Sequence, residues 1–194
     1  MNDAPHNIVP SSTEVSENSP AATVAQLRAE DQDPADTHTF SVDDERFQVV
    51  DNILKLRDNI SLDFEAESEI TLTLTTVDEA GSQHEQPVIL QVIDANDAPV
   101  PISQSTQHAA VAPFSFALPQ QTFSDEDGDS LSYSATLKNG EPLPPWLKFN
   151  PATLEFTVNT PDSKIDSIEV TVIADDGQSK ACLLYTSPSP RDRG

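Results

Sequence analysis

The sequence predicts an all-β protein with two β-sandwiches in tandem, and three observations lead to this prediction. Apolar and polar residues alternate in several short stretches, which is typical of half-buried strands. Proline is plentiful, with 16 residues, and no long segment keeps the period of a helix. The tetrapeptide Asn-Asp-Ala-Pro occurs at residues 2–5 and again 94 positions later at residues 96–99, which indicates a repeated unit.

Further acidic residues recur at nearly the same spacing, namely Asp31 with Asp125, Asp33 with Asp127 and Asp78 with Asp176. One such match is expected by chance in an acidic chain, whereas several matches at one spacing are not. We therefore interpret the chain as two tandem repeats, each folded as an antiparallel sandwich.

In the first repeat, the clearest strands are expected at residues 70–75 and 88–92, where apolar residues alternate with polar ones. Shorter strands are expected at residues 23–29, 38–42, 46–50 and 53–56. Asp78 has the parity of Ile70 and Leu72, so its carboxylate should extend an inward-facing row as the strand leaves the core. A carboxylate that loses water there needs a compensating partner, and a cation is one.

In the second repeat, strands are expected at residues 114–118, 131–137, 154–158 and 168–174. Trp146, which follows two prolines, is interpreted as a core residue. Asp176 extends the inward row of the last of these strands, as Asp78 does in the first repeat. No strand is expected after Gly177, so the second sandwich is predicted to be truncated.

The expected truncation follows from the interpretation of the C-terminal residues. Residues 182–192 read CLLYTSPSPRD, and these eleven residues back-translate to the transposase adapter of short-read sequencing libraries. We therefore set residues 182–194 aside as an artefactual tail. The only cysteine, Cys182, lies in this tail, so no thiol or disulfide chemistry is expected.

The charge balance and the absence of several sequence motifs exclude some classes of function. The chain has 33 acidic and 10 basic residues, for a net charge of −23, which argues against a nucleic-acid partner. No apolar run approaches the ~20 residues of a transmembrane helix, and no signal peptide is visible. The four histidines are scattered without zinc-ligand spacing, and no Gly-rich phosphate loop or Gly-x-Ser-x-Gly motif occurs. We therefore expect no enzymatic activity.

Short acidic motifs follow one another in a fixed order through residues 8–99: SEN at 16–18, EDQD at 30–33, LDFE at 62–65, Asp78, and DANDAP at 94–99. In this order they resemble a cadherin repeat. Residues 102–181 contain FSDEDGD at 123–129, LPPWL at 143–147 and ADDG at 174–177. These motifs resemble the dystroglycan-type cadherin-like domain of large bacterial surface adhesins.

The resemblance implies two Ig-like Greek-key sandwiches. Residues 1–7 would be a linker from a preceding repeat, 8–99 the cadherin repeat, 100–181 the cadherin-like domain without its last strand, and 182–194 the tail. It also implies Ca²⁺ at the junctions between repeats. Ca²⁺ takes about six to eight oxygen ligands, which carboxylates and carbonyl groups provide.

For the middle junction, the implied calcium ligands are Glu17, Asp63, Glu65, Asp94, Asn96, Asp97, Asp125, Asp127 and Asp176. For an incomplete N-terminal junction, they are Asn2, Asp3, Asp31, Asp33 and Asp78. The linker has Asp97-Ala98 where many cadherins have Asp-Asn, so one side-chain oxygen is lost.

The expected function is a calcium-stiffened stalk or adhesion segment of an extracellular protein, attached to a membrane or cell wall through regions outside this sequence. Its expected partners are neighbouring repeats of the same chain and other cell-surface proteins, homophilic ones included, or glycans. The alternative is an accessory or carbohydrate-binding module of a secreted enzyme, which an exposed aromatic strip would favour.

Overall fold

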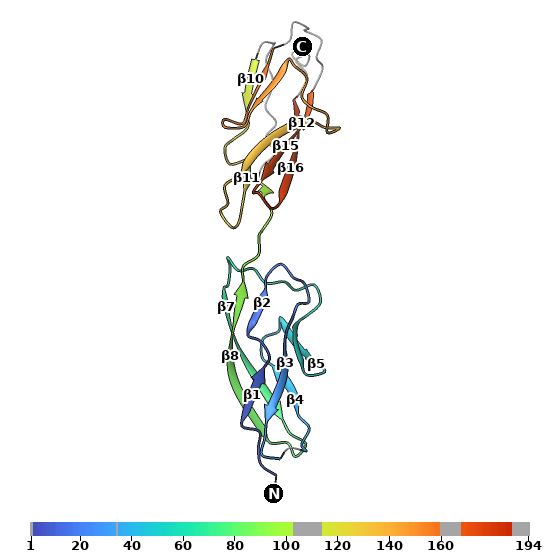
Figure 1. Ribbon diagram of the computed structural model, residues 1–194, viewed down its shortest axis with the longest axis vertical. Coiled ribbons are helices and arrows are strands. Elements are labelled where there is room, and N and C mark those ends of the chain that lie inside the picture. The colour runs from blue at the N-terminus through green and yellow to red at the C-terminus, as the bar shows by residue number, and fades with distance from the viewer. Residues whose placement is uncertain (1, 34, 103–113, 160–167, 188–194) are drawn as a thin grey trace, which may run out of the picture. The chain divides into compact units, whose positions relative to one another are not determined.

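The computed structural model describes residues 2–33, 35–102, 114–159 and 168–187, and this part of the chain contains strands but no helix (Figure 1). The all-β prediction is therefore confirmed. The chain divides into two compact units, Met1–Ala95 (unit 1) and Asn96–Gly194 (unit 2). Asn96 and Asp97 lie in unit 2 and form hydrogen bonds with its loops. The division thus precedes the boundary expected after Pro99.

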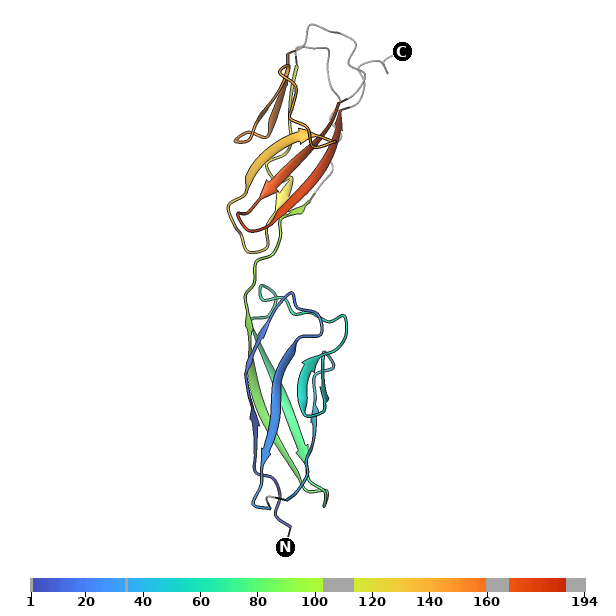
Figure 2. The ribbon, with the colours of Figure 1, turned by 45° about the vertical axis from the view of Figure 1, so that its right-hand side comes forward.

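Unit 1 is a sandwich of two four-stranded sheets (Figures 1 and 2). The first sheet has the order β1-β3-β6-β5, formed by β1 (Asn7–Pro10), β3 (Thr23–Glu30), β6 (Ile53–Leu56) and β5 (Phe47–Val50). The second has the order β2-β8-β7-β4, formed by β2 (Glu14–Ser16), β8 (Gln83–Ile93), β7 (Glu69–Val77) and β4 (Thr39–Val42). Neighbouring strands are antiparallel, except that β2 runs parallel to β8.

The period of two predicted for β7 is confirmed. Ile70, Leu72 and Leu74 are buried in the core between the sheets, and the threonines between them face outward. Asp78 follows β7 with the same parity and is 6% exposed, as its position at the end of the inward row predicts. The sequence pattern alone therefore positions this carboxylate at the edge of the core.

Unit 2 contains two three-stranded sheets. One has the order β10-β14-β13, formed by β10 (Phe114–Ala117), β14 (Glu155–Val158) and β13 (Leu147–Asn150). The other has the order β12-β15-β16, formed by β12 (Ser132–Leu137), β15 (Ile168–Asp175) and β16 (Lys180–Ser187). Two short strands, β9 (Val100–Pro101) and β11 (Phe123–Ser124), pair with each other.

Aromatic rings form much of the core of unit 2. Phe116 stacks on Phe156 with ring centroids 5.0 Å apart, and Phe149 lies against the same Phe156 ring at 4.7 Å. Trp146 packs against this core, as predicted. Phe116 also stacks on Tyr185 of β16 with ring centroids 5.1 Å apart, so large apolar side chains join the two sheets.

The structure differs from the expected truncation of unit 2. The last strand is present as β16, which pairs with β15 along its whole length. Its Leu183 and Tyr185 point into the core, while Leu184 faces outward. The residues set aside as a tail thus alternate with the period of a strand, and this alternation lets them cover β15. Residues 188–194 of the predicted tail lie outside the described residues.

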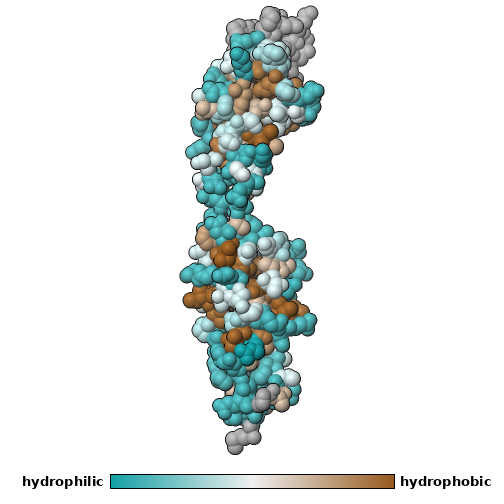
Figure 3. Space-filling view, in the orientation of Figure 1, coloured by the Kyte–Doolittle hydropathy of each residue, from teal (hydrophilic) through white to brown (hydrophobic). Residues whose placement is uncertain are grey.

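The surface of unit 1 is mainly hydrophilic on the face drawn in Figure 3, where hydrophobic residues form separate patches. Its exposed large apolar side chains include Val50, Ile89 and Ile93. Single exposed apolar residues are ordinary on folded domains and need no bound partner. The predicted ligands lie instead in loops at the ends of the strands.

Leu183→Ala should destabilise unit 2 by about 2–4 kcal/mol, because it removes a buried side chain and leaves a cavity. Leu184→Ala is the matched control, since Leu184 is on the same strand but is 45% exposed, against 4% for Leu183. Urea unfolding of the full chain, followed by the tryptophan fluorescence of unit 2, measures both variants. Equal effects of the two substitutions would contradict the register of β16.

Candidate metal centre

The residues predicted for the N-terminal junction meet at one end of unit 1, which we call the unit 1 rim: Asn2, Asp3, Asp31, Asp33 and Asp78. Asn2 Nδ2 donates a hydrogen bond to Asp78 Oδ2 at 2.9 Å. The backbone N–H of Asp3 donates to Asp33 Oδ2 at 2.7 Å, and that of Asp33 donates to Asp31 Oδ1 at 2.9 Å. The N-terminal segment, the β3–β4 loop and the β7–β8 turn are thereby joined.

Hydrogen-bond donors stabilise the ionised form of two of these acids. The Asn2 amide lowers the pKa of Asp78, and backbone and hydroxyl groups of Ser82 lower it further. The Asp33 backbone N–H lowers the pKa of Asp31, with a smaller effect from His38. His38 Nε2 lies 3.0 Å from Asp31 Oδ2. The carboxylates are therefore charged groups held in place by the backbone.

Sequence reasoning missed Asp36, which also belongs to the unit 1 rim. Oxygens of Asp31, Asp36 and Asp78 all lie within 4.8 Å of one another. Asp36 Oδ2 is buried and has no hydrogen-bond partner among the described residues. Burial raises the pKa of Asp36, and the charges of Asp33, Asp31, Asp78 and Glu79 raise it further. Its carboxylate therefore carries an uncompensated cost, which a cation would remove.

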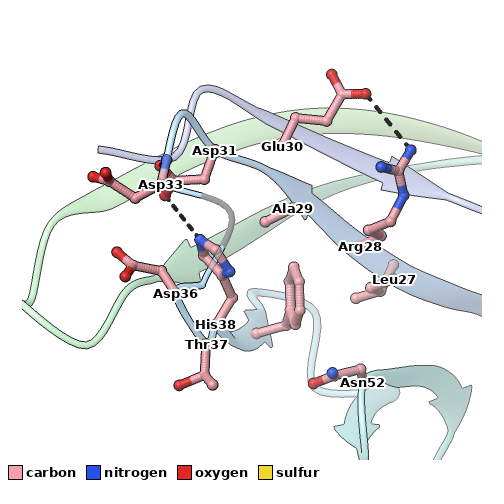
Figure 4. Close-up of a pocket in the computed structure, with 11 residues that line it drawn as sticks. Leu27, Arg28, Ala29, Glu30, Asp31, Asp33, Asp36, Thr37, His38 and Asn52 are labelled. Carbon is pink, nitrogen blue, oxygen red and sulfur yellow. Dashed lines mark hydrogen bonds and ion pairs between the residues drawn. The ribbon is translucent and has the colours of Figure 1, made fainter. Parts of the chain in front are cut away.

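A pocket of about 530 Å³ opens beside this group, with Leu27 and Phe40 among its apolar lining residues. Figure 4 shows Asp31, Asp33 and Asp36 on one side of the pocket, with His38 directed at Asp31. The signal that could have identified Asp36 is a further aspartate shortly after each Asp-x-Asp pair. Asp36 comes three residues after Asp33, and Asp129 comes two residues after Asp127.

Unit 2 has an equivalent rim, formed by Asn96, Asp97, Asp125, Asp127 and Asp176. Asn96 Nδ2 donates to Asp176 Oδ2 at 3.2 Å, and the Asp97 N–H donates to Asp127 Oδ2 at 2.7 Å. Asp125 and Asp127 group with Asp129, and Asp125 Oδ2 is buried without a hydrogen-bond partner among the described residues. Asn96 and Asp97, which were predicted as linker ligands, therefore lie at the same end of unit 2 as the other three predicted ligands.

The same pattern of hydrogen bonds is present in each rim. In unit 1 the Ser82 N–H donates to Asp78 Oδ1 at 2.8 Å, and in unit 2 the Ser179 N–H donates to Asp176 Oδ1 at 2.6 Å. This Ser179 bond is the largest cause of the lowered pKa of Asp176. The repeat seen in the sequence is thus a repeat of side-chain geometry.

The remaining predicted ligands come from the opposite end of unit 1, which we call the unit 1 base: Glu17, Asp63, Glu65 and Asp94. Glu17 is 1% exposed and Oε1 accepts the N–H of Ala95 at 2.7 Å. Glu17 Oε2 accepts the backbone N–H of Phe64 at 2.5 Å. Carboxylate oxygens of Glu17, Glu65 and Asp94 lie within 4.8 Å of one another.

Asp63 is not part of that group among the described residues. One of its oxygens instead accepts the N–H of Ala66 at 2.8 Å, so it closes the turn that carries Glu65. The sequence spacing of Asp63 and Glu65 predicted equal roles, whereas the turn directs them differently.

These groups have the chemistry of a hard-cation site. The grouped donors are carboxylate oxygens, without cysteine or histidine, which suits Ca²⁺ rather than Zn²⁺. Asp36 Oδ2 and Asp125 Oδ2 are buried, and no hydrogen bond from the described residues replaces the water that they lose. The residues therefore fit a bound Ca²⁺.

Comparison with known proteins supports the fold. A family model described as "Putative Ig domain" matches residues 98–187, which extend to the last residue of β16. No match to the sequence was found among curated proteins. The chain is similar to the solved structure of human protocadherin-24 EC1-2, form II, with a TM-score of 0.58, 20% identity and coverage of 96% of this chain and 99% of that chain.

Two longer cadherin structures are also similar. Protocadherin gamma B2 extracellular cadherin domains 1-5 match with a TM-score of 0.57 and 22% identity, over 100% of this chain and 41% of that chain. The human desmocollin-1 ectodomain matches with a TM-score of 0.56 and 16% identity, over 96% of this chain and 40% of that chain. The chain thus spans less than half of the length of these two solved structures, and the likeness is one of fold. Within the described residues, no helix is long and apolar enough to cross a bilayer.

Asp78→Asn should reduce the acid sensitivity of unit 1. The pKa of Asp78 is lowered from its ordinary value of 3.8 by the Asn2 and Ser82 hydrogen bonds. Folding therefore favours the ionised carboxyl, which stabilises the fold above pH ~4 and stops doing so as the pH falls through the lowered pKa.

In calcium-free buffer, the destabilisation caused by Asp78→Asn should be largest near neutral pH and shrink toward pH ~3. Urea unfolding across this range measures it. Asp51→Asn is the control, because Asp51 lies in the exposed β5–β6 turn with φ of 50°, which asparagine adopts readily. A destabilisation that does not change with pH would argue against an ionised Asp78 in the folded state.

Proposed function

We propose that this chain is a calcium-binding segment of an extracellular stalk or adhesion protein, in which bound ions restrain neighbouring repeats. The observation that carries the proposal is the duplicated rim network with its two buried, unpartnered carboxylate oxygens, Asp36 Oδ2 and Asp125 Oδ2. A cation bound at each rim would explain why each unit keeps a buried carboxylate oxygen in a position that is costly without one. The cadherin-like fold supports the same interpretation.

The proposed ligands of the middle junction come from three segments. The unit 1 base provides Glu17 and Glu65, with Asp63 as a turn residue that holds Glu65. The linker provides Asp94, Asn96 and Asp97, and the unit 2 rim provides Asp125, Asp127 and Asp176. Asp94 and Asn96 are separated by a single residue, so an ion bound to both would restrain the linker between the units.

Calcium would also offset the charge of the chain. The net charge of −23 is concentrated in part at the rims, where like charges repel. Extracellular calcium modules commonly bind at ~10⁻⁴–10⁻³ M, so these sites would be filled outside cells. We propose attachment to a cell surface through other regions of the protein, with neighbouring repeats, cell-surface proteins or glycans as partners.

The dystroglycan-type resemblance of residues 102–181 remains part of this proposal and points to large surface adhesins. The alternative, a carbohydrate-binding module, lacks the aromatic strip that would favour it. Phe114 aside, whose side chain is outside the described residues, every aromatic side chain belongs to a core or packs against one. The described surface therefore offers no aromatic platform for stacking a sugar ring.

Calorimetric titration of the full chain with CaCl₂, and with MgCl₂ for comparison, tests the proposal. We expect calcium binding at ~10⁻⁴–10⁻³ M and much weaker magnesium binding, because Mg²⁺ demands smaller octahedral sites. Small-angle scattering with calcium and with chelator should show a narrower range of interdomain arrangements when calcium is bound.

Asp97→Ala should weaken calcium binding more than Asp175→Ala. Asp97 is a proposed linker ligand, whereas Asp175 is already paired with Lys180 at 2.8 Å and is the matched control. The proposed function would be refuted if the titration showed no heat of calcium binding, or if calcium left the scattering unchanged.

Asp36→Asn should change calcium-free stability and calcium binding in opposite directions. Its raised pKa means that ionised Asp36 opposes folding near neutral pH, so the neutral side chain should raise the melting temperature in chelator. Loss of a charged ligand should at the same time weaken calcium binding at the unit 1 rim, on the order of tenfold.

Thermal unfolding with chelator and with calcium measures both effects. Asp58→Asn is the charge-matched control, because the Asp58 side chain is exposed and distant in sequence from the unit 1 rim. A variant that is less stable in chelator would show that Asp36 has a structural partner rather than a ligand role.

A further inference from the structure

The side-chain amide of Asn96 has a defined orientation in the unit 2 rim. Its Nδ2 donates to the backbone O of Asp97 at 2.9 Å, to Asp176 Oδ2 at 3.2 Å and to Ser179 Oγ at 3.3 Å. A carbonyl and a carboxylate can only accept hydrogen bonds, so the NH₂ group must face them. Asn96 Oδ1 is consequently directed away from these acceptors and is the atom that could bind a cation.

A neighbouring side chain already uses that oxygen. Gln178 Nε2 donates to Asn96 Oδ1 at 2.7 Å. Gln178 lies in the β15–β16 turn, where its backbone N–H donates to Asp176 Oδ1 at 2.6 Å. The turn that presents Asp176 thus also places a donor on the oxygen of Asn96.

Unit 1 is an internal comparison for this contact. Asn2 is held in the same way, with Nδ2 donating to the backbone O of Asp3 at 3.2 Å, to Asp78 Oδ2 at 2.9 Å and to Ser82 Oγ at 3.3 Å. The residue before Ser82 is Gly81, which has no side chain, whereas the residue before Ser179 is Gln178. Within the described part of unit 1, nothing donates to Asn2 Oδ1.

We propose that Gln178 competes with calcium for Asn96 Oδ1 and so sets a lower affinity at the unit 2 rim. This inference rests on the proposed function. The Gln178 N–H uses one of the two lone pairs of Asn96 Oδ1, so calcium that approaches along that direction has to displace Gln178 before Asn96 becomes a ligand. Gln178 is exposed and returns to water when displaced, so the competition is modest and reversible.

Calorimetric titration of full-length Gln178→Ala with CaCl₂ tests this inference. We expect binding about 2- to 10-fold tighter than in the natural chain, the range that corresponds to one neutral hydrogen bond. Gln83→Ala is the matched control, because it removes an exposed glutamine of unit 1 and should leave the affinity unchanged.

The side-chain NH₂ signals of Gln178 and Asn96 provide a second measurement. In ¹H–¹⁵N spectra, calcium should shift the Gln178 signal toward that of a free side chain, while the Asn96 NH₂ keeps its acceptors. Unchanged affinity in Gln178→Ala would overturn the inference, and weaker binding would show that Gln178 is itself a ligand. Absence of calcium binding in both the natural chain and the variant would refute the proposed function and the inference with it.

Discussion

The crowding of carboxylates at the strand ends is the constraint on which the organisation of both units depends. Partly buried like charges destabilise a fold unless donors or cations compensate them. Backbone N–H groups provide much of that compensation, as when Asp3 donates to Asp33 and Ser82 donates to Asp78. These bonds tie the N-terminal segment and two loops together, so the electrostatic demand of the rim also organises its backbone.

The compensation is incomplete in both units, and the incompleteness is informative. Asp36 Oδ2 and Asp125 Oδ2 are buried but accept no hydrogen bond from the described residues. Buried oxygens without partners are rare in folded proteins, because each forfeits its hydration. Both oxygens lie among further carboxylates, and this arrangement is the observation on which the proposed cation sites rest.

Comparison of the two rims distinguishes the hydrogen bonds that both units have from the contacts that only one unit has. The Asn–Asp–Ser network is present in both units although the strands around it differ in sequence. His38 beside Asp31 and Gln178 beside Asn96 are particular to one unit each. Two sites with one framework can therefore differ in chemistry through single neighbouring side chains.

Several features could be predicted from neighbouring residues alone. Alternation in residues 70–75 predicted β7, and its parity predicted the half-buried position of Asp78. The pairing of the Asn-Asp motif with the Asp-x-Asp loop 30 residues later was implied by the repeat and the resemblance, and it is present in both units.

By itself, the sequence determined the strand pattern, the repeat and most of the rim, because these follow from local periodicity and spacing. Tertiary structure decided what depends on contacts between distant segments. It brought Asp36 beside Asp78, used one Asp63 oxygen to close a turn, and built β16 from residues set aside as a tail. Spacing along the chain does not specify which carboxylate a folded loop turns inward, since that choice is made by the packing of the loop against its neighbours.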